Sequence, residues 1–446
     1  MPTNHALKRD LSLVHVVTMG LAWMSPMIFF TSFGVLYEGS GGMLLAAYML
    51  AFAAIIFTAS SYGQMATAFP VSGSAYTYVT KAMNPLLGFV VGWAILLDYL
   101  FSCIVAVLMF GINLNAQFPS VPSFIWILLL TLIIMVINII GIKTSANISK
   151  IFVLMQILFI SGFCALLVYK AMNGGIAAGL NPFAAAKGVS LTSILAGASL
   201  VCFSFLGFDS ITTMAEETKE PKKTIPRAIL IIVLTAGLLY FITAYLIQQL
   251  YPRFIYSNVD SAGYELMQMI GGGTLAAIFT FVIIFSILSQ GMSSMTTVTR
   301  LLFVMGRTSL LPGKFAAVHA RYRTPVFNII IVSIISLSAL FISLETAIKF
   351  VSFGALTAFL FVNLSVISHY IFRQKQRTPR DLLLRLACPL LGAGFILYLI
   401  TQLDRASLML GSGWIVIGLI YYSLQKNKSG FSARSHFEGN RRLMDS

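Results

Sequence analysis

Charged residues are scarce in this sequence: Asp, Glu, Lys and Arg make up 10% of its 446 residues, whereas 58% are hydrophobic. A soluble domain needs about a quarter of its residues charged to cover its surface. Most of the outer surface must therefore face lipid, which only helices or a closed barrel tolerate, because an unpaired backbone group there costs several kcal/mol. Apolar runs of about 20 residues, such as 124–142 and 228–247, match membrane helices and are too long for barrel strands.

Cysteine is also rare: there are four, all inside apolar stretches and none in a CxxC pair. This argues against zinc sites and disulfides and favours small buried apolar residues. The motifs HExxH and GxSxG, a P-loop and clustered Cys and His are all missing. No cleavage site follows the first apolar run, so we expect no signal peptide. We therefore predict a protein that is not an enzyme and holds no metal or cofactor.

The apolar runs predict twelve transmembrane helices with mostly short connections, and thus an all-α integral membrane protein without a separate soluble domain. The expected spans are 12–36, 43–67, 86–112, 122–142, 149–171, 191–215, 227–250, 272–299, 325–344, 347–372, 382–403 and 408–425. The predicted organisation is a cytoplasmic N-terminus 1–11, five-helix units 12–171 and 191–372, a final helix pair 382–425 and a cytoplasmic tail 426–446.

Lys and Arg are distributed unequally over the two sides of this arrangement. With both termini inside, 24 of the 29 lie in inner segments and the other 5 in outer ones. This bias is the positive-inside rule, and it predicts cytoplasmic N- and C-termini. The net charge of +15 is then a consequence of topology. Because no soluble domain exists to carry a basic face, we exclude nucleic acid as a partner.

Two spans are interrupted in a way that membrane anchoring does not require. The first contains Gly20 and Pro26, and Pro26 cannot donate to the helical ladder and disfavours helix at Ser25. The sixth places Gly207 beside Asp209 at similar depth. Either break alone is common in membrane helices. Matched breaks in corresponding spans of two five-helix halves are the best sequence pointer to a transporter's midplane site.

Such breaks free backbone groups that can bind a solute. Freed carbonyls accept from an ammonium group, and the half-helix that starts near Pro26 points its partly positive end at the gap, where a carboxylate can bind. Trp23, Phe205 and Phe208 could form apolar or cation–π walls around an amine. The breaks therefore predict a site for an amine or an amino acid.

Only two ionisable residues lie deep within the predicted spans, Asp98 in the third and Asp209 in the sixth. A carboxylate at mid-membrane costs about 2.5–3.5 kcal/mol on insertion scales, so its presence needs a reason. Asp98 is either a structural hydrogen-bond acceptor that faces the bundle or a site for an amine or a proton. Asp209 follows the second break directly, which favours the functional reading, as a carrier of the proton, of the amine, or of each in turn.

A mixed charge cluster follows the sixth span at its inner end, where Glu216 and Glu217 precede several Lys and Arg residues. Such a cluster is usually a solvated loop. It could also latch a cytoplasmic gate against Arg300, Arg307 or Arg323. We take Glu216, Glu217 and Arg307 as the gate candidates.

Several motifs resemble those of the amino acid–polyamine–organocation (APC) superfamily. The sequence CFSFLGFDSITTMAEETKEP at 202–221, followed by IPRAI at 225–229, is similar to its sixth-helix signature. FPVSGSAY (69–76) is similar to the loop after its second helix, and GFVVGW (88–93) is similar to the start of its third helix. MGR (305–307) with LP (311–312) is similar to the loop between its helices 8 and 9. The resemblance covers essentially the whole chain.

Within the superfamily, LDYLF at 97–101 and GLA at 20–22 resemble the bacterial putrescine importers most closely. The resemblance implies a bacterial inner-membrane protein with a LeuT-like five-plus-five inverted repeat, broken helices 1 and 6, alternating access and ion-coupled uptake. It places substrate between the broken helices, flanked by helices three and eight. The substrate-binding candidates are then Gly20, Ala22, Trp23, Met24, Ser25, Asp98, Phe203, Ser204, Phe205, Gly207, Phe208 and Asp209.

Two departures from those importers bear on substrate and coupling. They tend to carry an acid after the first break, in a Phe-Asp-Thr-Phe-Gly context, where this chain has Thr31. The missing carboxylate weakens the case for a dication and leaves a neutral or monocationic amino acid open. Some proton-driven relatives have a lysine in the middle of helix five, where this chain reads VLMQ at 153–156. Asp98 and Asp209 are therefore the candidates for carrying a proton.

The sequence thus predicts a secondary importer of amino acids or polyamines, coupled to H+, with Na+ as the open alternative. An exchanger that swaps substrate for its metabolic product would share all these features. A membrane sensor that binds solute without flux is a more distant alternative. The predicted partners are the small-molecule substrate, the coupling ion and the lipid bilayer.

Overall fold

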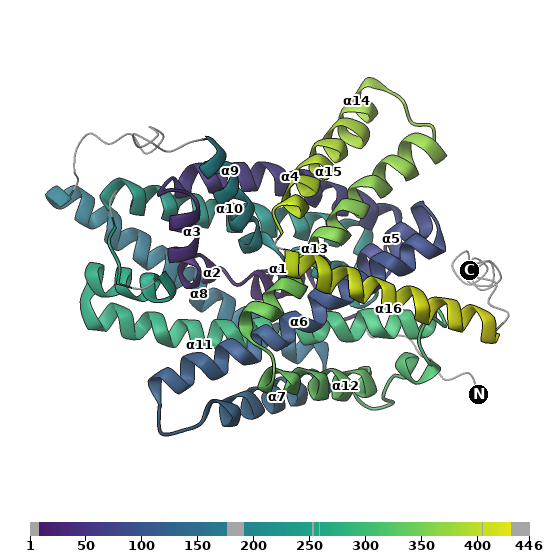
Figure 1. Ribbon diagram of the computed structural model, residues 1–446, viewed down its shortest axis with the longest axis horizontal. Helices are drawn as coiled ribbons and strands as arrows, with labels where there is room; N and C mark the ends of the chain where they lie inside the picture. The colour runs from purple at the N-terminus through teal and green to yellow at the C-terminus, as the bar shows by residue number, and fades with distance from the viewer. Residues whose placement is uncertain (1–8, 176–190, 252–253, 258, 404, 430–446) are drawn as a thin grey trace.

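Many of the long helices of this protein run along its longest dimension, whereas the helices at 344–366 and 379–401 cross them at an angle (Figure 1). The computed structural model describes residues 9–175, 191–251, 254–257, 259–403 and 405–429. Because a helix pairs its own backbone groups, a bundle of helices suits a chain that has so few charged side chains and must face lipid.

The α-helices, in chain order, are α1 (Leu13–Met24), α2 (Ile28–Thr31), α3 (Phe33–Gly39), α4 (Leu44–Ala68), α5 (Ser74–Ala82), α6 (Pro85–Gln117), α7 (Ser123–Ile140), α8 (Ile142–Lys170), α9 (Leu191–Val201), α10 (Pro221–Leu250), α11 (Ala262–Arg307), α12 (Val326–Ser336), α13 (Leu344–Val366), α14 (Pro379–Leu382), α15 (Cys388–Thr401) and α16 (Arg405–Ser429). The 3-10 segments are η2 (Cys202–Phe205), η3 (Ser210–Glu217), η4 (Val259–Ser261), η5 (Gly313–Ala316) and η6 (Leu337–Leu340). The π-helical segments are η1 (Ala171–Gly175), η7 (Ile367–Arg373) and η8 (Leu383–Ala387).

Within the described residues, eleven helical stretches are long and apolar enough to cross a membrane, and they coincide with eleven of the predicted spans. The ninth predicted span, 325–344, contains the shorter apolar stretch Val326–Leu340. The all-α membrane architecture is therefore confirmed. The count of twelve spans and the division into repeats stay predictions.

Three helices begin six or more residues earlier than predicted. Helix α8 begins at Ile142 rather than at 149, and α10 begins at Pro221 rather than at 227. Their first turns carry Lys or Arg, which the prediction took as the edge of the span, although a helix can extend beyond the hydrocarbon. Helix α11 begins at Ala262 rather than at 272, and Gly272 has a non-helical φ of 66°. The predicted boundary is thus a break inside a longer helix.

The two spans that were predicted to be broken are interrupted at those positions. In the first, α1 ends at Met24 and α2 resumes at Ile28. In the sixth, α9 gives way to the 3-10 segments η2 and η3. Helix α1 packs against α8, α10 and α11, and η3 packs against α1 and α11. The interrupted segments are therefore neighbours inside the bundle.

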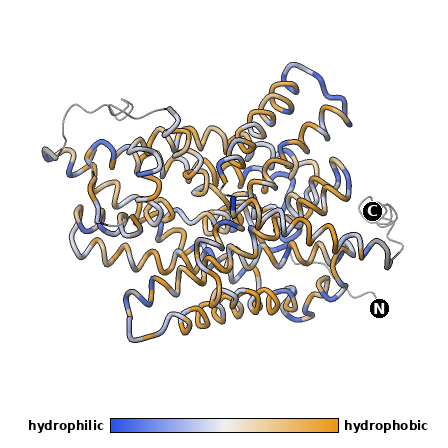
Figure 2. Tube along the Cα trace, in the orientation of Figure 1, coloured by the Kyte–Doolittle hydropathy of each residue, from blue (hydrophilic) through white to orange (hydrophobic). Residues whose placement is uncertain are grey.

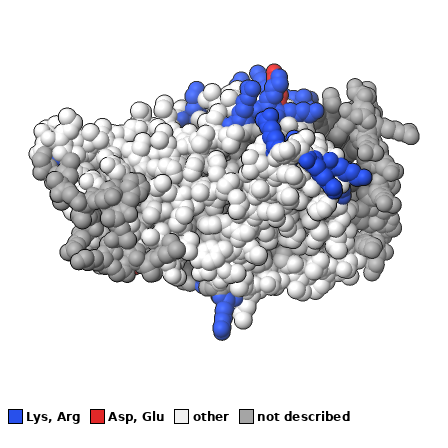
Figure 3. All heavy atoms as spheres, turned by 90° about the horizontal axis from the view of Figure 1, so that it is seen from above, with Lys and Arg blue, Asp and Glu red and all other residues white. Residues whose placement is uncertain are grey.

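Hydrophobic residues follow the long helices, and hydrophilic residues lie mainly at the turns (Figure 2). The face shown in Figure 3 is largely uncharged, with most of its Lys and Arg gathered along one edge. Near the described start of the chain, Leu11 exchanges backbone hydrogen bonds with Glu217 and Lys219, at 3.0 and 2.9 Å. Near its described end, Tyr421 donates to the carbonyl of Leu310, just beyond α11. Because η3 packs against α11, both ends lie on the same side of the bundle.

Candidate substrate-binding site

The first break bends the chain at Ser25, whose φ is 48°. The Ser25 amide still donates to the carbonyl of Leu21 at 2.8 Å, and the Ser25 carbonyl accepts from the amide of Ile28 at 2.8 Å. Pro26 between them has no N–H to continue the ladder. The Ser25 hydroxyl is 2.5 Å from the hydroxyl of Ser286 on α11. The break is thus fixed to α11 by a side-chain hydrogen bond.

The second break requires a glycine. Gly207 has a φ of 106°, and a Cβ built on it would lie 1.8 Å from Cδ1 of Trp23. Trp23 itself packs edge-on against Tyr99, with ring centroids 5.3 Å apart. The two breaks therefore meet directly, with the indole of the first lying on the backbone of the second.

We expect Gly207→Ala to destabilise the protein by at least about 2 kcal/mol, because positive φ disfavours any Cβ and the indole must move. Unfolding temperature and uptake should both fall. Gly162→Ala in α8 is the matched control, since nothing lies within 4 Å of a Cβ there. Equal behaviour of the two variants would contradict close packing of the two breaks.

Asp209 is fully buried and has one well-defined partner. Its Oδ2 accepts a hydrogen bond of 2.6 Å from the hydroxyl of Tyr99, which lies 3.1 Å from the hydroxyl of Ser74. Its Oδ1 has no hydrogen-bond partner among the described residues. A buried carboxylate oxygen without a partner is costly, so this atom is available to a proton or to a cation.

Asp98 is also buried, with 1% of its surface exposed. Its Oδ1 accepts from Ser102 at 3.2 Å, and its Oδ2 has no partner in the described part of the chain. Gly354 of α13 lies against it, since a Cβ there would be 2.7 Å from the Asp98 amide nitrogen. The Oδ1 contact thus fits a structural hydrogen-bond acceptor, and Oδ2 leaves open a role in binding an amine or a proton.

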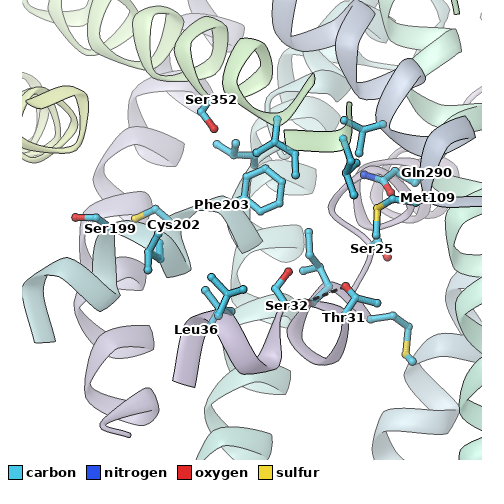
Figure 4. Close-up of a pocket in the computed structure, with 18 of the residues that line it drawn as sticks. Ser25, Thr31, Ser32, Leu36, Met109, Ser199, Cys202, Phe203, Gln290 and Ser352 are labelled. Atoms are coloured by element: carbon cyan, nitrogen blue, oxygen red, sulfur yellow. Dashed lines mark hydrogen bonds between the residues drawn. The ribbon is translucent and has the colours of Figure 1, made fainter. Parts of the chain in front are cut away.

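A cavity of about 400 Å³ lies beside the first break and the start of the second (Figure 4). Of the predicted substrate residues, only Ser25 and Phe203 line it. Its polar lining comes from Ser25, Thr31, Ser32, Ser199, Ser286, Gln290, Ser352 and Gln402. The remaining lining residues are apolar or Cys202, and none of the described lining residues is Asp, Glu, Lys or Arg. The cavity therefore offers hydroxyl and amide groups but no counter-charge.

Neither Asp98 nor Asp209 lines this cavity. Asp98, Ser102, Val105 and Met109 are spaced by three or four residues and so share one face of α6, and of these Val105 and Met109 line the cavity. Seven residues of helix place Asp98 about 10 Å from Val105 along the axis. This face of α6 thus extends from the cavity to the buried carboxylate of Asp98.

The other predicted substrate residues belong to the packed core. Phe205 packs against Tyr48 and Tyr240, and the hydroxyls of these tyrosines contact the Ser204 hydroxyl at 3.2 Å and the Ser204 carbonyl at 3.1 Å. Phe208 packs against Tyr62 and Phe359, with ring centroids 5.6 and 5.2 Å apart. Gly20 lies against Ile232, and Ala22 and Met24 are buried.

Two ion pairs join η3 to the far end of α11. The buried pair consists of Glu217 and Arg300, each with 1% of its side chain exposed, and its N···O distances are 2.9 and 3.2 Å. The outer pair consists of Glu216 and Arg307, at 2.8 and 2.5 Å. Burial lowers the pKa of Lys81 in α5, and the nearby Glu216 carboxylate opposes that shift. The gate candidates Glu216, Glu217 and Arg307 are therefore in one cluster, with Arg300 the additional partner.

Comparison with known proteins identifies the family. The amino acid permease family model matches residues 14–412. The low-affinity putrescine importer PlaP of Escherichia coli K12 is 38% identical over 424 residues, 93% of each chain. The branched-chain amino acid permease BcaP of Bacillus subtilis is 28% identical over 458 residues, 95% of this chain and 94% of the relative. The methylthioribose transporter of the same species is 26% identical over 455 residues, 95% of each.

These similarities confirm the predicted APC resemblance and the prediction of a transporter rather than an enzyme. The chain belongs to the amino acid permease family.

Proposed function

We propose that this protein is a secondary importer of amino acids or polyamines that works by alternating access and proton symport. The observation that supports this best is the position of the cavity relative to the ion pairs. The cavity lining from α11 ends at Gln290, and Arg300 follows ten residues later in the same helix. That spacing corresponds to about 15 Å. A cavity on one side of the breaks, with ion pairs beyond them on the other, fits one half of an alternating-access cycle.

The proposed architecture is a LeuT-like pair of inverted repeats, 12–171 and 191–372, followed by 382–425. Its support is the matched interruption of the first helix in each unit, at Ser25 and Gly207. Glu216, Glu217, Arg300 and Arg307 form the cytoplasmic gate in this proposal, with both termini cytoplasmic. Breaking these pairs would free η3 from α11 and open the inner side.

The proposed proton carriers are Asp209 and Asp98, because each is buried and has one carboxylate oxygen that finds no partner among the described residues. Gln156 of α8 donates to the hydroxyl of Ser289 at 3.3 Å and occupies the region where some proton-driven relatives have a lysine. An inside-negative potential of about 100 mV would favour import of a monocation by roughly 2.3 kcal/mol.

Uptake into proteoliposomes tests this function directly. A panel of diamines and of neutral and cationic amino acids would be assayed with imposed pH and sodium gradients, applied separately. Accumulation driven by the pH gradient supports the proposal, and accumulation driven by sodium alone contradicts proton coupling. Counterflow without any ion gradient, combined with no net uptake, would instead identify an exchanger.

Because none of the described cavity-lining residues is charged, introducing a charge at Thr31 tests which substrate charge the cavity accepts. We expect Thr31→Asp to raise uptake of a diamine, relative to a neutral amino acid, by about tenfold, because a carboxylate at this wall adds a favourable charge interaction of about 1.4 kcal/mol. Thr31→Asn is the neutral control of similar size. The idea is wrong if both variants shift the ratio equally.

A further inference from the structure

A basic segment connects η7 to α15. Between Arg373 and Arg385 it contains five cations, Arg373, Lys375, Arg377, Arg380 and Arg385, and one acid, Asp381. The face seen in Figure 3 shows Lys and Arg gathered with little acid among them. The proposed transport mechanism does not use this surface.

Two of the five cations already make side-chain contacts within the protein. Arg373 donates to the carbonyls of Lys81 and Met83, both at 2.6 Å. Arg385 pairs with Asp381 at 2.9 Å and lies over the ring of Tyr370, 4.3 Å from its centroid. These contacts fix the two ends of the basic segment.

The other three, Lys375, Arg377 and Arg380, are exposed and make no ion pair within the described part of the chain. The turn that carries them is ordered, because Thr378 and Asp381 form a capping box at the start of α14. Three free cations are thus held close together on a defined backbone.

Exposed leucines follow the cations immediately. Leu382, Leu383 and Leu384 have 40%, 60% and 40% of their surface exposed. They lie near the start of the helical stretch Pro379–Thr401, which is apolar enough to cross a membrane. Cations beside exposed leucines at the end of a span suit the boundary between headgroups and acyl chains, where a cytoplasmic leaflet carries negative charge.

We propose that residues 375–384 form a binding site for anionic phospholipid. The headgroup phosphate is held by Lys375, Arg377 and Arg380, and the acyl chains cover the leucines. An acidic soluble protein would satisfy the cations but would leave the leucines to be covered separately, so a lipid is the better fit for this surface.

This site is physically connected to the inner ion pairs. Arg373 and Ser368 hold the last carbonyls of α5, the latter through a 2.6 Å bond to Ala82. The side chain of Lys81 on that helix lies in the field of Glu216 and Arg307. Lipid bound at the basic segment therefore acts on the helix that borders the proposed gate, and the transport rate should depend on anionic lipid.

The experiment is a lipid titration of the purified full chain in uncharged detergent, with thermal unfolding as the readout. Phosphatidylglycerol should raise the unfolding temperature saturably, and phosphatidylcholine should not. Each cation near an anionic surface contributes about fivefold to affinity. The variant K375Q/R377Q/R380Q should therefore need at least about tenfold more phosphatidylglycerol for half of the effect.

The matched control is K222Q/K314Q/R321Q, which removes three exposed cations elsewhere on the predicted cytoplasmic side. It should respond as the parent chain does. Equal loss in both variants, or an equal response to phosphatidylcholine, would overturn the site. The same saturable shift with inorganic phosphate would show a free-anion site instead of a lipid site. Because this experiment measures lipid binding and not transport, its outcome does not depend on the proposed transport function.

Discussion

Asp209→Asn is expected to reduce uptake by about a hundredfold or more, equivalent to about 2.7 kcal/mol. Asparagine keeps the shape and the acceptor oxygen for the Tyr99 hydroxyl, which now lies 2.6 Å from Oδ2. It removes the negative charge and the ability to carry a proton, which are the two properties that the proposed mechanism uses. Initial rates in proteoliposomes under a fixed pH gradient give the measurement.

The accompanying variants separate the roles of charge and hydrogen bonding. Tyr99→Phe deletes the hydrogen bond and keeps the acid, so it should reduce uptake much less than Asp209→Asn. Expression and monodispersity of both variants should match the parent protein. Transport by Asp209→Asn at normal affinity and rate would remove Asp209 from the mechanism.

The membrane spans could be predicted from the sequence because lipid imposes a single requirement on every one of them. Backbone groups must be paired inside each helix, and side chains must be apolar over about 20 residues. The breaks were also visible, since Pro26 lacks a donor and Gly207 tolerates a φ of 106°. Helix starts were less accurate, because Lys or Arg in a first turn does not end a helix.

The cavity lining could not be predicted in the same way, because it depends on which faces of distant helices converge. Ser199, Ser352 and Gln402 come from three different elements, and nothing local distinguishes them from other polar residues in spans. Ile283, Ser286 and Gln290 are spaced as one face of α11, so their stripe was detectable. Within the motif around Gly207, Phe203 lines the cavity, whereas Phe205 and Phe208 pack into the core.

Arg300→Met is expected to destabilise the protein by about 3–5 kcal/mol, because it leaves the buried Glu217 carboxylate without its partner. Arg300 also donates to Thr296 and Thr299, at 3.3 and 3.1 Å, and these bonds are lost as well. Arg307→Met, at a side chain that is 40% exposed, should cost less than about 1 kcal/mol. Thermal and denaturant unfolding of both variants in the same detergent gives the comparison.

The double variant Glu217→Gln with Arg300→Met distinguishes a gate from simple structural support. Neutralising both partners removes the unpaired charge, so stability should recover substantially. A gate predicts that transport stays impaired in this stable protein, because the buried pair no longer holds η3 against α11 when the outer side opens. Normal transport in the stable double variant would mean that the pair only supports the fold. Since Glu216 and Arg307 remain in place, any residual closure would be attributable to that outer pair, and adding Arg307→Met should then abolish it.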